Sequence, residues 1–285
     1  MRWEQGPRSS NVEDRRGMGM GPMAIGGGGL GAVVLVVLSL LFGADPREVL
    51  QQTQGAAPVE QRQPGQPRAD DKLADFSSAV LARTEQVWGK QFSERGERYT
   101  PPTLVLYDNY TQTACGNGQA AMGPFYCPLD RKLYIDLSFF RELDRRFGAP
   151  GDFAAAYVIA HEVGHHVQTL MGVSDQVRRA QQRAGRVGAN QLSVRMELQA
   201  DCLAGVWARQ ANADGQVLEP GDIDEAMAAA ASVGDDTLQR ASGRAVAPDA
   251  FTHGSSAQRQ QWFNTGYGSG RMEACDTFNS PDGRA

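Results

Sequence analysis

Histidine is scarce in this chain, and a block of positive charge is missing altogether. Only four of the 285 residues are histidine. The 28 lysine and arginine residues are outnumbered by 33 aspartate and glutamate residues, which gives a formal net charge of −5. Without a Lys/Arg-rich block the sequence has no electrostatic footprint for nucleic acid, so we expect no nucleic-acid partner. It also has no Cys-x-x-Cys pair, which argues against a cysteine zinc site.

Charged side chains are also absent from residues 23–43, most of which are apolar. A helix of this length covers roughly 30 Å, about one bilayer hydrocarbon core. A buried core helix would instead show a single apolar stripe. A cleaved signal peptide would begin nearer Met1 and end at a small-x-small site. We therefore predict one uncleaved transmembrane helix over 23–43.

Positive charge is concentrated before this stretch, where four arginines lie, while one arginine follows it closely. The more positive flank normally stays in the cytoplasm. We therefore expect residues 1–22 to be a cytoplasmic segment of a plasma (inner) membrane protein. Residues 44–70 are rich in Gln and Pro and poor in large apolar groups, which predicts a flexible linker. The folded domain, at 71–285, is then expected to be periplasmic or extracellular.

From Asp71 onward the apolar residues follow the spacing of secondary structure. Spacing of three and four predicts a helix within 73–88, ended by two prolines, and four more further along. These are at 152–170, 190–211, 222 to about 231, and from Ser255 through 263. The segment 103–107 reads as a strand and 125–136 as a hairpin. The domain is predicted to be α+β, mainly helical, with a small sheet.

Three of the four histidines fall in one short motif, HEVGHH at 161–166. Positions four apart share one face of a helix, so His161 and His165 can reach the same ion. Imidazole binds Zn²⁺ well, and catalytic zinc takes three protein ligands and a water. Glu162 is placed to act as general base on that water. His166 lies about 100° round the helix from His165 and is predicted to be a supporting or surface residue.

A third ligand is needed, and Glu197 is the best candidate, 32 residues beyond His165 on another predicted helix. Asp201 lies at i+4 on the same face, where it can accept a hydrogen bond from the distal N–H of a ligand histidine. An exposed charged face is the alternative interpretation. Both helices, however, are largely apolar, and polar groups buried in them are costly unless something binds them.

These residues together resemble the neutral zinc metallopeptidase family of single-pass bacterial membrane proteins. The shared pieces are NVEDRRG at 11–17, GPFYCP at 123–128, HEVGHHVQ at 161–168, ELQADCLAGVWA at 197–208, THGSS at 252–256 and CDTF at 275–278. They span nearly all of the chain outside the linker. The resemblance implies a zincin-like fold with a glutamate as third ligand and one Zn²⁺ per chain.

The four cysteines fit this picture as two disulfides formed outside the cytoplasm. Cys115 and Cys127 bracket a short Gly-rich loop, and a bond from Cys202 to Cys275 would tie the ligand helix to the C-terminal tail. This pairing is one of three that four cysteines allow.

His253 is a candidate catalytic residue that donates a hydrogen bond to the oxyanion formed during peptide attack. A structural loop histidine is the alternative interpretation. The hydroxyls of Tyr126, Tyr134 and Tyr157 are other candidate donors, and the sequence does not choose among them.

The sequence thus predicts zinc-dependent hydrolysis of peptide bonds in a peptide or protein substrate. The competing hypothesis is a non-catalytic exported scaffold or binding module of the cell envelope, stabilised by zinc. Hydrolysis of a non-peptide amide would use the same metal site. The sequence carries no signal for the oligomeric state.

Overall fold

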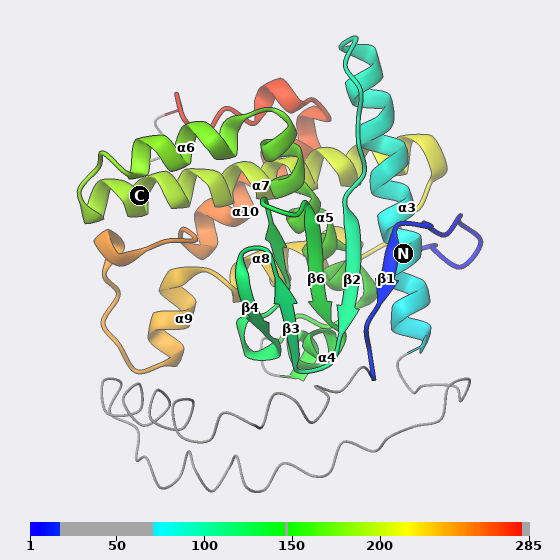
Figure 1. The fold of residues 1–285 in the computed structure, drawn as a ribbon, viewed down its shortest axis with the longest axis horizontal. Helices are drawn as coiled ribbons and strands as arrows, with labels where there is room; N and C mark the ends of the chain where they lie inside the picture. The colour runs from blue at the N-terminus through cyan, green and yellow to red at the C-terminus, as the bar shows by residue number, and fades with distance from the viewer. Residues whose placement is uncertain (18–70, 146–147, 281–285) are drawn as a thin grey trace, which may run out of the picture. The chain divides into compact units, whose positions relative to one another are not determined.

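The computed structural model describes residues 1–17, 71–145 and 148–280, which are mainly helical with two small sheets (Figure 1). Met1–Asp14 and Ala69–Ala285 form one compact unit. The strands are β1 (Val12–Asp14), β2 (Thr103–Tyr107), β3 (Tyr110–Thr113), β4 (Gly116–Gln119), β5 (Phe125–Cys127) and β6 (Lys132–Asp136). The helices are α3 (Asp71–Glu94), α4 (Ser138–Arg145), α5 (Asp152–Leu170), α6 (Val173–Gln181), α7 (Arg186–Gly215), α8 (Asp222–Ser232), α9 (Asp235–Ala241) and α10 (Ser256–Ser269).

The larger sheet has the strand order β1-β2-β6-β5. Strands β1, β2 and β6 are parallel, while β5 and β6 form the antiparallel hairpin predicted for 125–136. Alternate side chains of β2 and β6 enter the main core, because successive residues of a strand point to opposite faces. These core residues are Leu104, Leu106, Leu133 and Ile135. Strand β5 is an edge strand of this sheet, and two of its residues line the cleft described below.

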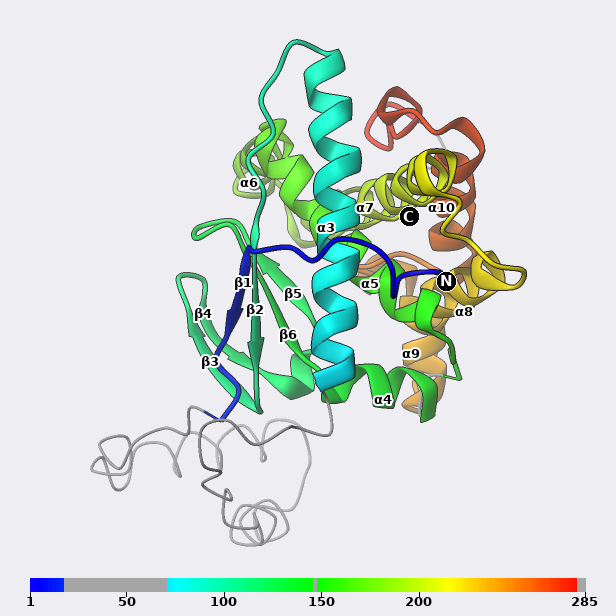
Figure 2. The ribbon, with the colours of Figure 1, turned by 90° about the vertical axis from the view of Figure 1, so that its right-hand side faces the viewer.

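The helices α5, α7, α8 and α10 gather on one side of the sheet (Figure 2). Helix α5 has the bounds predicted from its apolar spacing and is buried along most of its length. Helix α7 extends beyond the predicted 190–211 at both ends. Ser255 caps α10, and its side chain and that of Gln258 form a reciprocal capping box. The cap fixes where α10 begins, as the sequence indicated.

The predicted membrane anchor is not supported. Among the helices of the described residues, none combines the length and the apolar character that crossing a membrane requires. The segment 23–43, on which the prediction fell, lies outside the described residues.

The N-terminal segment corrects the predicted location further. Val12, Glu13 and Asp14 pair in parallel with residues 104–106 of β2. Trp3 is buried and packs edge-to-face on Phe76 of α3, with ring centroids 5.4 Å apart. A strand lies on the same side of any membrane as the sheet that contains it. The predicted arrangement, with a cytoplasmic N-terminus and an exported catalytic domain, is therefore wrong.

The amino group of Met1 also reaches the starts of two core helices. It forms ion pairs with Asp152, the first residue of α5, and with Asp222, the first residue of α8. Together with Glu225, these two carboxylates make an acidic group of the kind that can hold a cation. The amino group supplies positive charge there, and it links residues 1–14 to the start of the motif helix.

Two glycines allow the central helices to approach closely. A Cβ added at Gly164 of α5 would lie 3.0 Å from the carbonyl oxygen of Ala200 on α7, so a neighbouring helix explains the glycine in the motif. A Cβ added at Gly266 of α10 would lie 1.8 Å from the carbonyl oxygen of Cys202. Helix α7 is therefore packed against α5 at one crossing and against α10 at the other.

Substitution of Gly266 tests the second crossing. Gly266→Ala forces α7 and α10 apart, and we expect the free energy of unfolding to fall by about 1–3 kcal/mol, the usual cost of overpacking a core. Gly268→Ala on the same helix is the control, because nothing lies within 4 Å of the added Cβ. It should be neutral or stabilising, since Ala favours a helix over Gly by about 1 kcal/mol. Urea unfolding measures both, and equal stability of the two variants would contradict the close crossing.

Candidate metal centre

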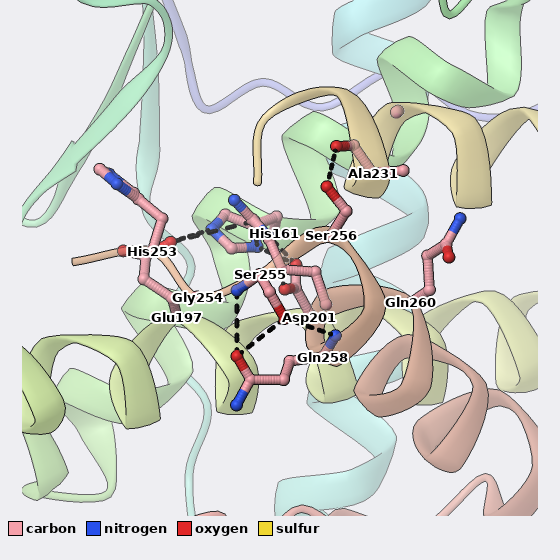
Figure 3. Close-up of polar contacts among 12 residues, drawn as sticks. His161, Glu197, Asp201, Ala231, His253, Gly254, Ser255, Ser256, Gln258 and Gln260 are labelled. Atoms are coloured by element: carbon pink, nitrogen blue, oxygen red, sulfur yellow. Dashed lines mark hydrogen bonds and ion pairs between the residues drawn. The ribbon is translucent and has the colours of Figure 1, made fainter. Parts of the chain in front are cut away.

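Three side chains from two helices converge on one point. Helix α5 carries His161 and His165 one turn apart, and α7 carries Glu197. One ligand atom of each lies within 4.8 Å of those of the other two. The carboxylate oxygens of Glu197 lie 3.2 Å from Nε2 of His161 and 3.4 Å from Nε2 of His165. Figure 3 shows His161 beside Glu197. The structure thus brings together the three ligands expected from the sequence.

The spacing of these atoms is compatible with one shared zinc ion. Imidazole nitrogen and carboxylate oxygen bind zinc at about 2.1 Å, so two ligand atoms at tetrahedral positions are roughly 3.4 Å apart. One carboxylate oxygen of Glu197 lies 3.2 Å from Nε2 of His161 and the other lies 3.4 Å from Nε2 of His165, close enough for the three side chains to share one ion. Three protein ligands leave the fourth position open, as in catalytic zinc sites. Two imidazoles and one carboxylate also suit zinc better than magnesium or calcium, which prefer oxygen ligands.

The charges around this point favour a cation. Burial by itself would lower the pKa of His161, but the carboxylates of Asp201 and Glu197 outweigh it and raise that pKa to about 10. Burial would likewise raise the pKa of Glu197, yet the two histidines hold it well below its usual range. A site that stabilises a proton on His161 so strongly also attracts a divalent cation, which replaces that proton when it binds.

Asp201 contacts His161, one of the two histidines that the sequence predicts as ligands. The Nδ1–H of His161 donates to Oδ1 of Asp201 at 2.8 Å, which leaves Nε2 free to face Glu197. Asp201 is fully buried and also accepts a hydrogen bond from the hydroxyl of Tyr157. Because metal-ligating histidines depend on such partners for their tautomer, Asp201 prepares Nε2 for a metal.

Arg259 on α10 neutralises Asp201, and the sequence analysis missed it. Its Nε and Nη2 donate to the two oxygens of Asp201 at 2.8 Å and 2.9 Å. Burial would raise the pKa of Asp201, but Arg259 and His161 outweigh it and hold that pKa below its usual range. A signal was present: Arg259 lies three and four residues before Trp262 and Phe263, on the buried face of the predicted helix.

Glu162 and His166 have different surroundings on the same helix. Glu162 is buried at the wall of the cleft, and burial raises its pKa above the usual range. His166 donates from Nε2 to the carbonyl of Thr100 and accepts at Nδ1 from the hydroxyl of Tyr126. Burial lowers its pKa to about 4, so His166 is a neutral supporting residue whose two ring nitrogens are already engaged.

A cleft of about 1180 Å³ opens over the three ligands and is lined by β5, α5, α7 and the loop before α10. His253 lies at its wall with its side chain half exposed. The carboxylate of Asp235 accepts hydrogen bonds from the backbone N–H groups of Thr252, His253 and Gly254, which fixes this loop. A hydrogen bond from Nδ1 of His253 to Asp235 raises the pKa of His253.

The tyrosine hydroxyls proposed as alternative oxyanion donors are all engaged elsewhere. Tyr126 donates to His166, Tyr134 to Asp130, and Tyr157 to Asp201. This leaves His253 as the best placed of the four candidates, because its Nε2 is not used by the bonds to Asp235 and Thr252.

Both predicted disulfides are present. Cys115 is bonded to Cys127 and Cys202 to Cys275, and the described residues contain no free cysteine. The second bond joins Cys202 of α7, five residues after Glu197, to Cys275 in the tail that follows α10. It therefore ties the helix that carries Glu197 to the C-terminal end of the domain.

Removal of Arg259 tests how strongly the buried charges depend on one another. Arg259→Leu leaves the Asp201 carboxylate buried without its cation, and we expect a loss of about 3–5 kcal/mol in the free energy of unfolding. The double variant with Asp201→Asn should lose less, because neither charge remains. Lys90→Met, which breaks the exposed ion pair with Asp214, is the control and should cost less than about 1 kcal/mol. Urea unfolding of metal-free protein gives these values, and a single variant as stable as the double would contradict the pairing.

Comparison with known proteins agrees with this geometry. The family model described as "Putative neutral zinc metallopeptidase" matches residues 1–278. The uncharacterized protein YpfJ of Escherichia coli (strain K12) is 48% identical over 288 residues, covering 98% of this chain and 99% of the relative. The uncharacterized protein Rv2575 of Mycobacterium tuberculosis (strain H37Rv) is 42% identical over 265 residues, covering 86% of each. No solved structure matches. The chain belongs to the neutral zinc metallopeptidase family.

Proposed function

We propose that this protein hydrolyses peptide bonds with one zinc ion held by His161, His165 and Glu197. The observation that carries the proposal is the convergence of these three side chains within reach of one ion, beside the buried Glu162 and in one open cleft. A bound zinc ion would acidify a water molecule and polarise the carbonyl of the substrate. Side chains of the protein itself would move the proton and stabilise the oxyanion.

Glu162 is the proposed general base. It would take a proton from the attacking water and pass that proton to the leaving amine. Glu162 follows His161 directly on α5, so the rigid helix fixes the position of the base relative to the first ligand. His161 and His165 lower the pKa of Glu162, while burial acts in the opposite direction and dominates.

His253 is the proposed donor to the developing oxyanion. Its Nδ1 is held by Asp235, which raises the pKa of the ring, and the residue lines the cleft. A positioned donor of this kind stabilises charge that appears only in the transition state. Asp235 acts through His253 by fixing both its loop and its ring.

The proposed substrate is a peptide or protein segment in extended conformation. Strand β5 ends the strand order of the sheet, and its residues Phe125 and Tyr126 line the cleft. An extended peptide can add to such an edge through main-chain hydrogen bonds. Helix α5 contacts β5, so a peptide on this edge would pass close to the motif helix.

Glu162→Gln separates catalysis from metal binding. The variant keeps all three ligands, so we expect stoichiometric zinc but a fall in kcat of about 10²–10⁴, the usual contribution of a general base. Elemental analysis and chelator-sensitive cleavage of a casein-type substrate measure the two properties. Glu142→Gln, another glutamate of the cleft wall, is the control and should retain activity. Wild-type turnover by Glu162→Gln would overturn the assignment of the base. Stoichiometric zinc without turnover by the wild type would favour the non-catalytic binding module.

His253→Ala tests the oxyanion role. We expect kcat to fall by about 10²–10³ with little change in KM, because the hydrogen bond forms only in the transition state. Zinc content should not change, since His253 is not a ligand. Steady-state kinetics on a fluorogenic peptide give both constants, and an unchanged kcat would assign the donor elsewhere.

A further inference from the structure

The two proposed zinc-ligating histidines have different hydrogen-bond partners: a carboxylate for His161 and an amide for His165. The side chain of Gln168, three residues further along α5, lies 2.8 Å from Nδ1 of His165 through its Oε1. His161 is oriented by a carboxylate that an arginine neutralises, whereas His165 is oriented by a neutral amide. Gln168 is fully buried, so its polar atoms must be satisfied within the protein.

The orientation of the Gln168 amide follows from its other contacts. Its Nε2 donates to the carbonyl oxygen of Met196 at 2.8 Å and to Oε1 of Gln199 at 3.1 Å. A backbone carbonyl can only accept, so the nitrogen of Gln168 must face α7 and its oxygen must face His165. That oxygen accepts from Nδ1–H, which leaves the lone pair of His165 on Nε2, facing Glu197.

The orientation of Gln199 is fixed in the same way. Its Nε2 donates to the carbonyl oxygen of Cys275 at 2.9 Å, so its Oε1 faces Gln168. The donors therefore run in one direction, from His165 to Gln168, to Gln199 and to the carbonyl of Cys275. Hydrogen bonds aligned in this way strengthen one another in a buried setting.

We call this run of hydrogen bonds, from His165 through Gln168 and Gln199 to the carbonyl of Cys275, the relay. It ends on the C-terminal tail, at the disulfide between Cys202 and Cys275. Helix α7 therefore holds the tail covalently, and the tail presents the carbonyl that orients Gln199. A glutamate at 168 could still accept from His165, but its second oxygen would face the oxygens of Met196 and Gln199. The chemistry at both ends of the side chain thus requires glutamine.

We propose that Gln168 and Gln199 are positioning residues that fix the tautomer and direction of His165, and that the Cys202–Cys275 disulfide anchors them. The proposal rests on the proposed zinc site. It links the proposed ligand His165 on α5 to Cys275 near the C-terminal end of the domain. It also gives the second disulfide a role in metal binding that the first disulfide lacks.

Zinc affinity, measured by chelator competition on the full chain, tests the relay. We expect Gln168→Leu to weaken zinc binding by about 10–100-fold, the usual effect of losing the partner of a metal-bound histidine. Gln168→Glu restores the acceptor and should recover part of the affinity. Gln181→Leu is the matched control, because Gln181 also donates to a backbone carbonyl and a side-chain oxygen but touches no ligand. Its zinc affinity should equal that of the wild type.

Two further measurements separate positioning from a general loss of stability. The visible spectrum of the cobalt-substituted protein should change in Gln168→Leu and Gln199→Leu but not in Gln181→Leu. The variant with Cys202→Ser and Cys275→Ser should bind zinc more weakly than the variant with Cys115→Ser and Cys127→Ser. Equal zinc affinity for the two cysteine variants would overturn the anchoring role.

The outcomes also distinguish this proposal from the proposed function. Wild-type protein that binds no zinc would refute the metal site itself. Wild-type protein with one zinc per chain, together with unchanged affinity and an unchanged cobalt spectrum in Gln168→Leu, would overturn the relay and leave the metal site in place.

Discussion

The close crossing of α5 and α7 is the contact on which the rest of the site depends. Gly164 lies against the backbone of Ala200, and any larger residue would hold the two helices apart. Glu197 and Asp201 lie on either side of Ala200 in sequence, so the distance between the helices decides whether both carboxylates reach His161. Close packing in a protein interior leaves little slack to compensate for such a shift. The proposed metal site therefore depends on Gly164, which has no side chain of its own but allows the two helices to pack closely.

Burying so many polar groups requires that each of them has a partner. The structure meets this requirement differently for the two histidines. His161 is hydrogen-bonded to Asp201, whose negative charge is offset by Arg259. His165 rests on Gln168, whose amide needs no counter-ion. The carboxylate of Glu197 favours a cation at the ligand cluster, while Arg259 offsets the buried charge of Asp201.

The N-terminal segment changes how the whole chain is understood. Strand β1 completes the parallel part of the sheet, and residues 1–14 belong to the same compact unit as the metal centre. The match of the family over residues 1–278 includes this segment. The charge pattern at the start of the chain suggested a segment separated from the domain. In the folded protein Arg8 instead pairs with Asp75 of α3.

The sequence by itself determined the features that depend on local spacing. The motif at 161–165 places two imidazoles one turn apart on any helix, and apolar periodicity located α5, β2 and the β5–β6 hairpin. Other long-range contacts were decided by the tertiary structure alone. Arg259 lies 58 residues from Asp201, and β1 pairs with a strand about 90 residues away, across the segment 18–70. A short strand such as Val-Glu-Asp has no periodicity to reveal it. Such contacts depend on how helices and strands pack, because no local pattern of side chains specifies a partner so far along the chain.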